Sequence, residues 1–123
     1  IGTDIIKISR ISKSIKKKSF INRLFNKDEI LKCNKTKNSA NCFAKRFAAK
    51  EALSKSFGTG IRDNLSFKDI EILNDKMGKP FFYKSKKIDK IIKKKFKIKK
   101  YDLFLSLSDE KDHSIAFTIL VKR

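Results

Sequence analysis

The clearest helical pattern in the chain begins at Phe43 and ends at Gly58. The run is rich in alanine and free of proline, so we expect a helix of about four turns. Gly58 suits a left-handed C-cap, and Ser39 is a plausible N-cap. At 100° per residue, the apolar side chains on one face are Phe43, Phe47, Leu53 and Phe57. Lys50 projects onto that face, and Glu51 lies beside it.

Alternation of apolar and polar residues predicts strands in several places. Residues 1–8 form the first, with Gly2, Asp4, Ile6 and Ile8 on one side. Residues 67–73 and 80–83 form two more, joined by a hairpin turn at 74–79. Residues 103–108 and 113–121 form the last two, joined by an acidic turn, and Ile115, Phe117, Ile119 and Val121 fall on one face.

The remaining segments read as helices. Two short ones fit within 9–25, and Asn26 with Glu29 resembles a capping box that opens a third, through Cys33. Residues 86–97 form a basic amphipathic helix that we expect to pack on the sheet. The chain is therefore expected to be one α+β domain over residues 1–123, with a largely antiparallel sheet packed against the long helix.

Composition and charge limit the partners and the cellular compartment that we expect for this protein. The 123 residues carry a formal charge of +19, which favours acidic partners or phosphates. Most of the 32 basic residues are lysine, whereas base readout in nucleic acids relies on arginine. Cys33 and Cys42 match neither a zinc knuckle nor a redox pair, so reduced thiols in the cytoplasm are the default expectation, with a disulfide left open. No apolar stretch is long enough to span a membrane.

Few residues offer catalytic chemistry. The single histidine, His113, gives a catalytic triad little material, and no phosphate-binding loop of the P-loop type is present. The remaining candidates are Asp4 and Glu51, two oxygen ligands from separate elements with lysines and an arginine nearby. Such a pair suits a Mg²⁺ ion that retains water and binds substrate phosphates.

Plainer interpretations exist for the same residues. The long helix can be an amphipathic core helix in which Lys50 extends its amine to the surface and Glu51 pairs with Lys55. Asp4 can be an exposed carboxylate near a sheet edge. The high charge alone also fits a small basic nucleic-acid-binding protein, which is the alternative function.

Two motifs resemble the signatures of the 4′-phosphopantetheinyl transferase superfamily, and most closely its short branch, the holo-acyl-carrier-protein synthases. The first is Gly-Thr-Asp-Ile at 2–5. The second is Arg-Phe-Ala-Ala-Lys-Glu-Ala at 46–52, followed by Lys55 and Phe-Gly-Thr-Gly at 57–60. The likeness continues through Gly78-Lys79-Pro80 and Ser106-Leu107-Ser108, and so covers nearly the whole chain.

The resemblance implies transfer of the 4′-phosphopantetheine arm of coenzyme A to a serine of apo-acyl carrier protein, with release of adenosine 3′,5′-bisphosphate, in support of fatty acid biosynthesis. It implies Mg²⁺ ligation by Asp4 and Glu51, which with Lys55 form the catalytic group. The coenzyme-binding residues that it implies are Arg46, Lys50, Lys55, Gly58, Gly78, Pro80 and Ser108. Lys50 and Lys55 would hold the pyrophosphate. Asp109 stands where some members carry a coenzyme-binding histidine, so no role is assigned to it.

Assembly and partner binding follow from the same resemblance. The short branch corresponds to half of the larger enzymes, so we expect an active site shared between subunits of a homotrimer. An acidic carrier protein is expected to dock on a basic stretch made of Arg10, Lys13, Lys16 and Lys17.

Overall fold

The computed structural model describes residues 1–58 and 65–123. Its elements follow an α+β order, as expected from the sequence. They are β1 (Gly2–Lys7), α1 (Ile8–Ser14), α2 (Lys18–Leu24), α3 (Lys27–Lys35), α4 (Ser39–Ser56), a 3₁₀ turn η1 (Phe67–Asp69), β2 (Ile72–Asn74), β3 (Pro80–Phe82), α5 (Lys86–Phe96), β4 (Tyr101–Asp109) and β5 (His113–Lys122).

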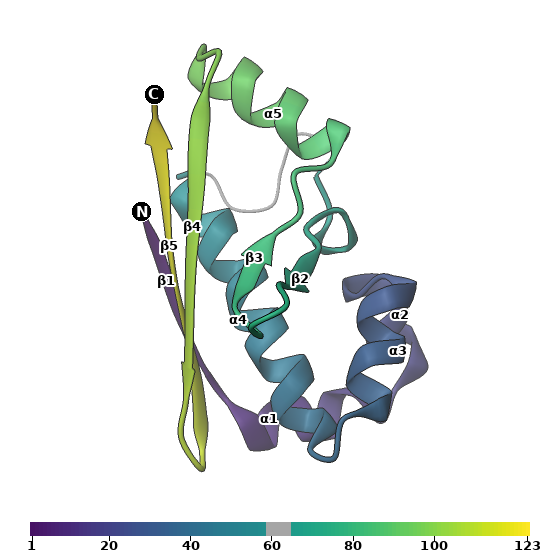
Figure 1. The fold of residues 1–123 in the computed structure, drawn as a ribbon. Coiled ribbons are helices and arrows are strands. Elements are labelled where there is room, and N and C mark those ends of the chain that lie inside the picture. Colours follow the sequence, from purple (N-terminus) through teal and green to yellow (C-terminus); the bar gives the residue numbers. More distant parts are fainter. Residues whose placement is uncertain (59–64) are drawn as a thin grey trace.

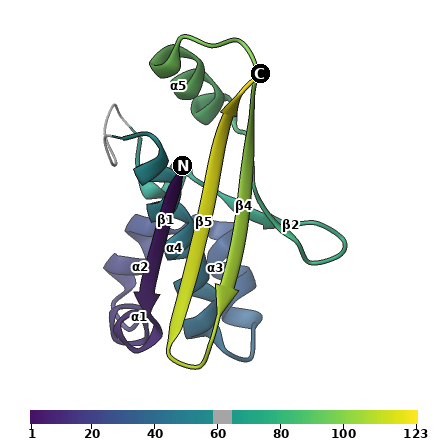
Figure 2. The same cartoon turned by 90° about the vertical axis from the view of Figure 1, so that its left-hand side faces the viewer.

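The main sheet has the strand order β1-β5-β4 and is entirely antiparallel. The long helix α4 runs behind it, and the β2–β3 hairpin and the shorter helices lie on the same side (Figure 1). Turned by 90°, the molecule presents the bare sheet to the viewer, with the helices behind it (Figure 2). The predicted antiparallel sheet on a long helix is thus confirmed.

Local signals placed most element ends to within two residues. Asn26 and Glu29 form the predicted capping box at the start of α3. The N-cap of α4 is Asn38 rather than Ser39, because the Asn38 side chain accepts a hydrogen bond from the Asn41 backbone N–H. The predicted strand at 67–73 is mostly wrong: a 3₁₀ turn capped by Ser66 and Asp69 occupies its first half.

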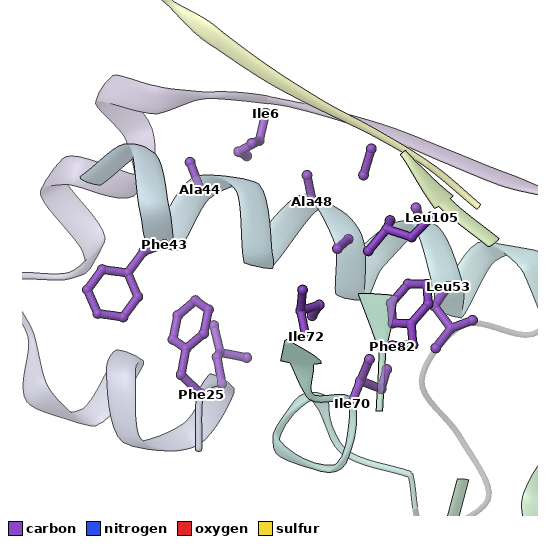
Figure 3. Close-up of a cluster of buried hydrophobic side chains, with 14 of the residues drawn as sticks. Ile6, Phe25, Phe43, Ala44, Ala48, Leu53, Ile70, Ile72, Phe82 and Leu105 are labelled. Carbon is purple, nitrogen blue, oxygen red and sulfur yellow. The ribbon is translucent and has the colours of Figure 1, made fainter. Parts of the chain in front are cut away.

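Close contact between β1 and α4 depends on small residues. A Cβ atom on Gly2 would lie 1.9 Å from the backbone oxygen of Ala52, so only glycine fits there. Ala44, Ala48 and Ala52 are fully buried. Figure 3 shows Ile6 of β1 facing Ala44 and Ala48 across this contact. The alanines beside Glu51 therefore admit a chain segment, as expected, and that segment is β1.

The inner face of β5 is its less apolar face, which is the opposite of what hydrophobicity alone suggests. The face that packs toward α4 carries the buried Ser114, Ala116 and Thr118. The predicted apolar row lies on the opposite, outward face, where Ile115, Phe117 and Val121 are exposed. Small side chains point inward because α4 lies so close to the sheet.

Cys33 and Cys42 form a disulfide between α3 and α4, with their Cα atoms 5.4 Å apart. The default expectation of reduced thiols is therefore wrong for this structure. The two helices are neighbours joined by a short loop, which brings the two residues together.

Among the described residues, no helix is both long enough and apolar enough to cross a bilayer.

Candidate active site

Asp4 and Lys55 meet where β1 lies along the second half of α4. The Lys55 amine lies 3.0 Å from Asp4 Oδ1 and also donates to the Thr3 carbonyl oxygen at 3.2 Å. The Asp4 side chain is 14% exposed, whereas that of Lys55 is 54% exposed. Asp4 sits on the same side of β1 as the buried Gly2 and Ile6, as the strand pattern predicted. The sheet thus holds the carboxylate against the helix.

Glu51 belongs to the same group of charges. Burial and the nearby Asp4 carboxylate raise its pKa, while Lys55 and Arg10 partly oppose the shift. Two carboxylates that repel each other in a half-buried position favour a cation between them. Glu51 lies one helical turn before Lys55, so α4 presents both side chains toward β1.

These residues fit a hard divalent cation. Asp4 and Glu51 come from different elements, and Lys55 already supplies one positive charge to Asp4. In the described part of the chain, no cluster of three or more metal-binding side chains exists. Two carboxylates suit Mg²⁺ in particular, because this ion commonly retains water and takes further oxygens from a phosphate ligand.

A second group forms around Arg46, on another side of α4. Its guanidinium donates to Asn74 Oδ1 at 2.9 Å, and the Asn74 amide donates to the Gly78 carbonyl oxygen at 3.0 Å. Pro80 pairs with Asn74 across the β2–β3 hairpin. Three residues expected at a coenzyme site are therefore brought together.

Lys32 is a member of this group that the sequence alone did not indicate. Its amine donates to Asn74 Oδ1, the oxygen that also receives Arg46. Arg46 is 5% exposed and its buried Nε has no partner among the described residues. Two cations converge on one neutral oxygen, an arrangement that favours an anion. The only signal for Lys32 in the sequence is its basic side chain one helical turn before Thr36. Lysine is too common in this chain for that signal to single out one residue.

Lys50 does not lie where the prediction of a pyrophosphate contact would place it. Its side chain is fully buried, and its amine donates to Glu29, Leu24 and Phe67 at 2.6, 2.8 and 2.9 Å. Burial lowers the pKa of this amine, and Glu29 partly offsets the effect. The expectation that Lys50 contacts pyrophosphate is not met, because its projection onto the apolar face places the amine in the core instead of the site.

The other predicted residues lie apart from the carboxylates. Ser108 pairs with Ile115, which in turn pairs with Ile5, so its side chain lies on the outward face of the sheet. Asp109 accepts a hydrogen bond from the Asn41 amide at 2.6 Å, which is a structural contact. Gly58 has the predicted left-handed backbone, with φ 81°. Thr59 and Gly60 of the same motif lie outside the described residues.

The predicted docking stretch is exposed along its length. Arg10 and Lys13 lie on α1, and Lys16 and Lys17 precede α2. Arg10 is close enough to Glu51 to affect its pKa. The basic stretch therefore begins beside the carboxylates and leads away from them.

Comparison with known proteins identifies the family of the chain. Residues 1–118 match the model of the 4′-phosphopantetheinyl transferase superfamily. The chain is 54% identical over 123 residues to a holo-[acyl-carrier-protein] synthase of Pelagibacter ubique, covering 100% of this chain and 96% of the relative.

Solved structures give the same result. The holo-[acyl-carrier-protein] synthase of Neisseria meningitidis superposes with a TM-score of 0.85 at 37% identity, over 99% of this chain and 96% of that one. The Helicobacter pylori enzyme, solved in complex with coenzyme A, superposes with a TM-score of 0.80 at 33% identity, over 97% of each chain. The chain therefore belongs to the 4′-phosphopantetheinyl transferase superfamily, in its holo-acyl-carrier-protein synthase branch.

Proposed function

We propose that this enzyme transfers 4′-phosphopantetheine from coenzyme A to a serine of an apo-acyl carrier protein, with Mg²⁺ as its metal, in the cytoplasm and in support of fatty acid biosynthesis. The observation that carries the proposal is the convergence of Asp4, Glu51 and Lys55. The names of the relatives support the reaction, and the coenzyme A complex of the Helicobacter pylori relative supports the donor.

In the transfer, the serine oxygen attacks the phosphorus that carries the pantetheine arm. The bond from that phosphorus to the bridging oxygen breaks, and adenosine 3′,5′-bisphosphate leaves. Bound Mg²⁺ would neutralise charge on the pyrophosphate. Asp4 and Glu51 would hold it, and Lys55 would stabilise the charge that develops on the phosphate oxygens. Glu51, acting through one water molecule, would accept the serine proton.

Arg46, Asn74 and Lys32 are proposed to bind a phosphate of the coenzyme. An anionic group beside Asn74 would accept from both cations, and it would also approach Nε of Arg46, which has no partner among the described residues. Gly78 and Pro80 would line the pocket from the hairpin. Gly58, which follows the C-cap of α4 beyond Lys55, would contact the coenzyme at that end of the helix.

The carrier protein is proposed to dock on Arg10, Lys13, Lys16 and Lys17. All four side chains are exposed and Arg10 lies near Glu51, so an acidic protein bound along this stretch would bring its serine toward the carboxylates. Opposite charges on the two surfaces would speed the encounter and make it sensitive to salt.

A homotrimer with shared sites is proposed on two observations. The outward face of the sheet exposes Ile5, Phe104, Ile115, Phe117 and Val121, more apolar surface than an isolated sheet face usually presents. Arg46 and Glu51 are five residues apart on α4, about 140° around the helix, so the two groups face different directions. A neighbouring subunit would cover the apolar face and complete the site. Ser108, on that face, would contact coenzyme bound by the neighbour.

The proposal is tested by Glu51→Gln. The enzyme is incubated with coenzyme A, Mg²⁺ and apo-acyl carrier protein, and the mass of the intact carrier is measured. We expect the phosphopantetheine adduct with the parent and at least a 100-fold slower transfer with the variant, because the amide is a poor Mg²⁺ ligand. Glu110→Gln, on an exposed turn, is the matched control and should remain active. No adduct with the parent would refute the function, and full activity of Glu51→Gln would refute the metal site.

A further inference from the structure

Glu29 and Lys50 form an ion pair sealed inside the protein. Their side chains are 1% and 0% exposed, and the amine lies 2.6 Å from Glu29 Oε1. Its other two donors reach the carbonyl oxygens of Leu24 and Phe67, so all three are used. The amine also lies 5.0 Å from the centroid of the Phe25 ring. Lys50 thus connects α4 to the end of α2 and to η1.

Glu29 extends the network to the hairpin. Its Oε1 also accepts from the Asn26 backbone N–H at 3.2 Å, at the capping box of α3. Its Oε2 accepts from the backbone N–H of Ile72 at 3.2 Å. Ile72 is the first residue of β2, and this bond fixes the start of the hairpin against α3 and, through Lys50, against α4.

The fixed segment leads directly to the anion-binding group. Asn74 lies two residues after Ile72 and receives Arg46 and Lys32. Arg46 lies one turn before Lys50 on α4, and Lys32 lies three residues after Glu29 on α3. The ion pair therefore holds all three elements that supply this group.

Stability alone does not explain such a pair. Well-packed apolar residues often serve as well as a buried ion pair, because burying two charges costs nearly as much as their attraction returns. A fully satisfied polar network instead fixes one geometry, since each donor and acceptor has a defined position.

We propose that Glu29 and Lys50 are positioning residues that hold the β2–β3 hairpin against α4, so that Arg46, Lys32 and Asn74 are arranged to bind a phosphate of the coenzyme. The inference rests on the proposed function. In this proposal, Lys50 supports coenzyme binding by fixing the position of the hairpin, without contacting the substrate.

Glu29→Gln is the sharpest test. The amide keeps one accepting oxygen, which cannot serve both Lys50 and Ile72, while the overall shape of the side chain is retained. Binding of coenzyme A and of adenosine 3′,5′-bisphosphate is measured by calorimetry without carrier protein. We expect both to bind about 10-fold more weakly or worse, with the KM for carrier protein changed less than twofold.

Ile92→Ala is the matched control for lost stability. Ile92 is fully buried in α5, and its apolar side chain makes none of the hydrogen bonds that link Glu29, Lys50 and Ile72. This variant should lower Tm as much as Glu29→Gln does, or more, and still bind coenzyme A like the parent. If both variants lose coenzyme affinity in proportion to Tm, the pair is only structural and the proposal fails.

A second variant guards against failure to fold. Lys50→Met combined with Glu29→Gln leaves no charge at the site of the buried pair and is expected to fold. It should bind coenzyme A at least as weakly as Glu29→Gln. Parental affinity in either folded variant would overturn the inference. A parent enzyme that itself fails to bind coenzyme A would refute the proposed function instead.

Discussion

Gly2→Ala tests how closely β1 must approach α4 for the active site to form. The new Cβ atom would lie 1.9 Å from the Ala52 backbone oxygen and 2.9 Å from both the Ala52 carbonyl carbon and the Ser56 nitrogen. These atoms belong to helix backbone and cannot rotate away. Restoring an ordinary contact of 3.4 Å requires a displacement of 1.5 Å along this direction.

The displacement acts on the catalytic group because Asp4 follows Gly2 by two residues and Glu51 precedes Ala52 directly. Moving β1 from α4 separates Asp4 from both Glu51 and Lys55. A misplacement of about 1 Å can cost about 100-fold in rate, and forced overpacking costs about 1–3 kcal/mol in stability. We therefore expect kcat/KM to fall about 100-fold and the concentration of Mg²⁺ needed for half-maximal rate to rise.

The assay follows transfer of phosphopantetheine to carrier protein at a series of Mg²⁺ concentrations, with Tm measured in parallel. Thr3→Ala is the control, because the Thr3 side chain is exposed on the opposite side of the strand. It should stay within twofold of the parent. A Gly2→Ala enzyme with parental rate, Mg²⁺ dependence and Tm would refute the reasoning, since β1 would then tolerate displacement.

Four further predictions address the charges and the assembly. Asp4→Asn should lower the pKa of Glu51 in the metal-free protein, because the Asp4 carboxylate is one of the two causes that raise it; an NMR titration of the Glu51 carboxyl carbon measures this, and an unchanged pKa would show that the two carboxylates do not interact. The raised pKa keeps a proton on Glu51 to higher pH than on a free glutamate. On acidification, the affinity for Mg²⁺ should therefore begin to fall at a higher pH than an unperturbed glutamate would allow. Arg10→Glu should raise the KM for carrier protein several-fold more than that for coenzyme A, and equal effects would exclude docking on this stretch. Phe117→Glu places a charge on the outward sheet face and should convert the assembly to monomers in analytical ultracentrifugation, whereas an unchanged mass would locate the interface elsewhere.

Local patterns in the sequence predicted most of the fold. Most helices and strands follow a period of 3.6 or 2, and a cap such as Asn26 with Glu29 needs only four consecutive residues. The strand predicted at 67–73 failed because Ser66 and Asp69 bond locally and close a 3₁₀ turn, which outweighs the alternation that follows.

The sequence by itself also indicated the proposed catalytic residues, because Asp4, Glu51 and Lys55 lie in motifs that resemble those of the family, and periodicity sets the side that they face. Tertiary structure decided which partners the other charged groups find. Helical projection placed Lys50 on the apolar face but could not show that Glu29, 21 residues away, is its partner in the core. Likewise, Lys32 and Arg46 converge on Asn74 only because α3, α4 and the hairpin pack together. The choice of the less apolar face of β5 as the inner one has the same origin, since helix and sheet approach each other closely enough to admit only small side chains.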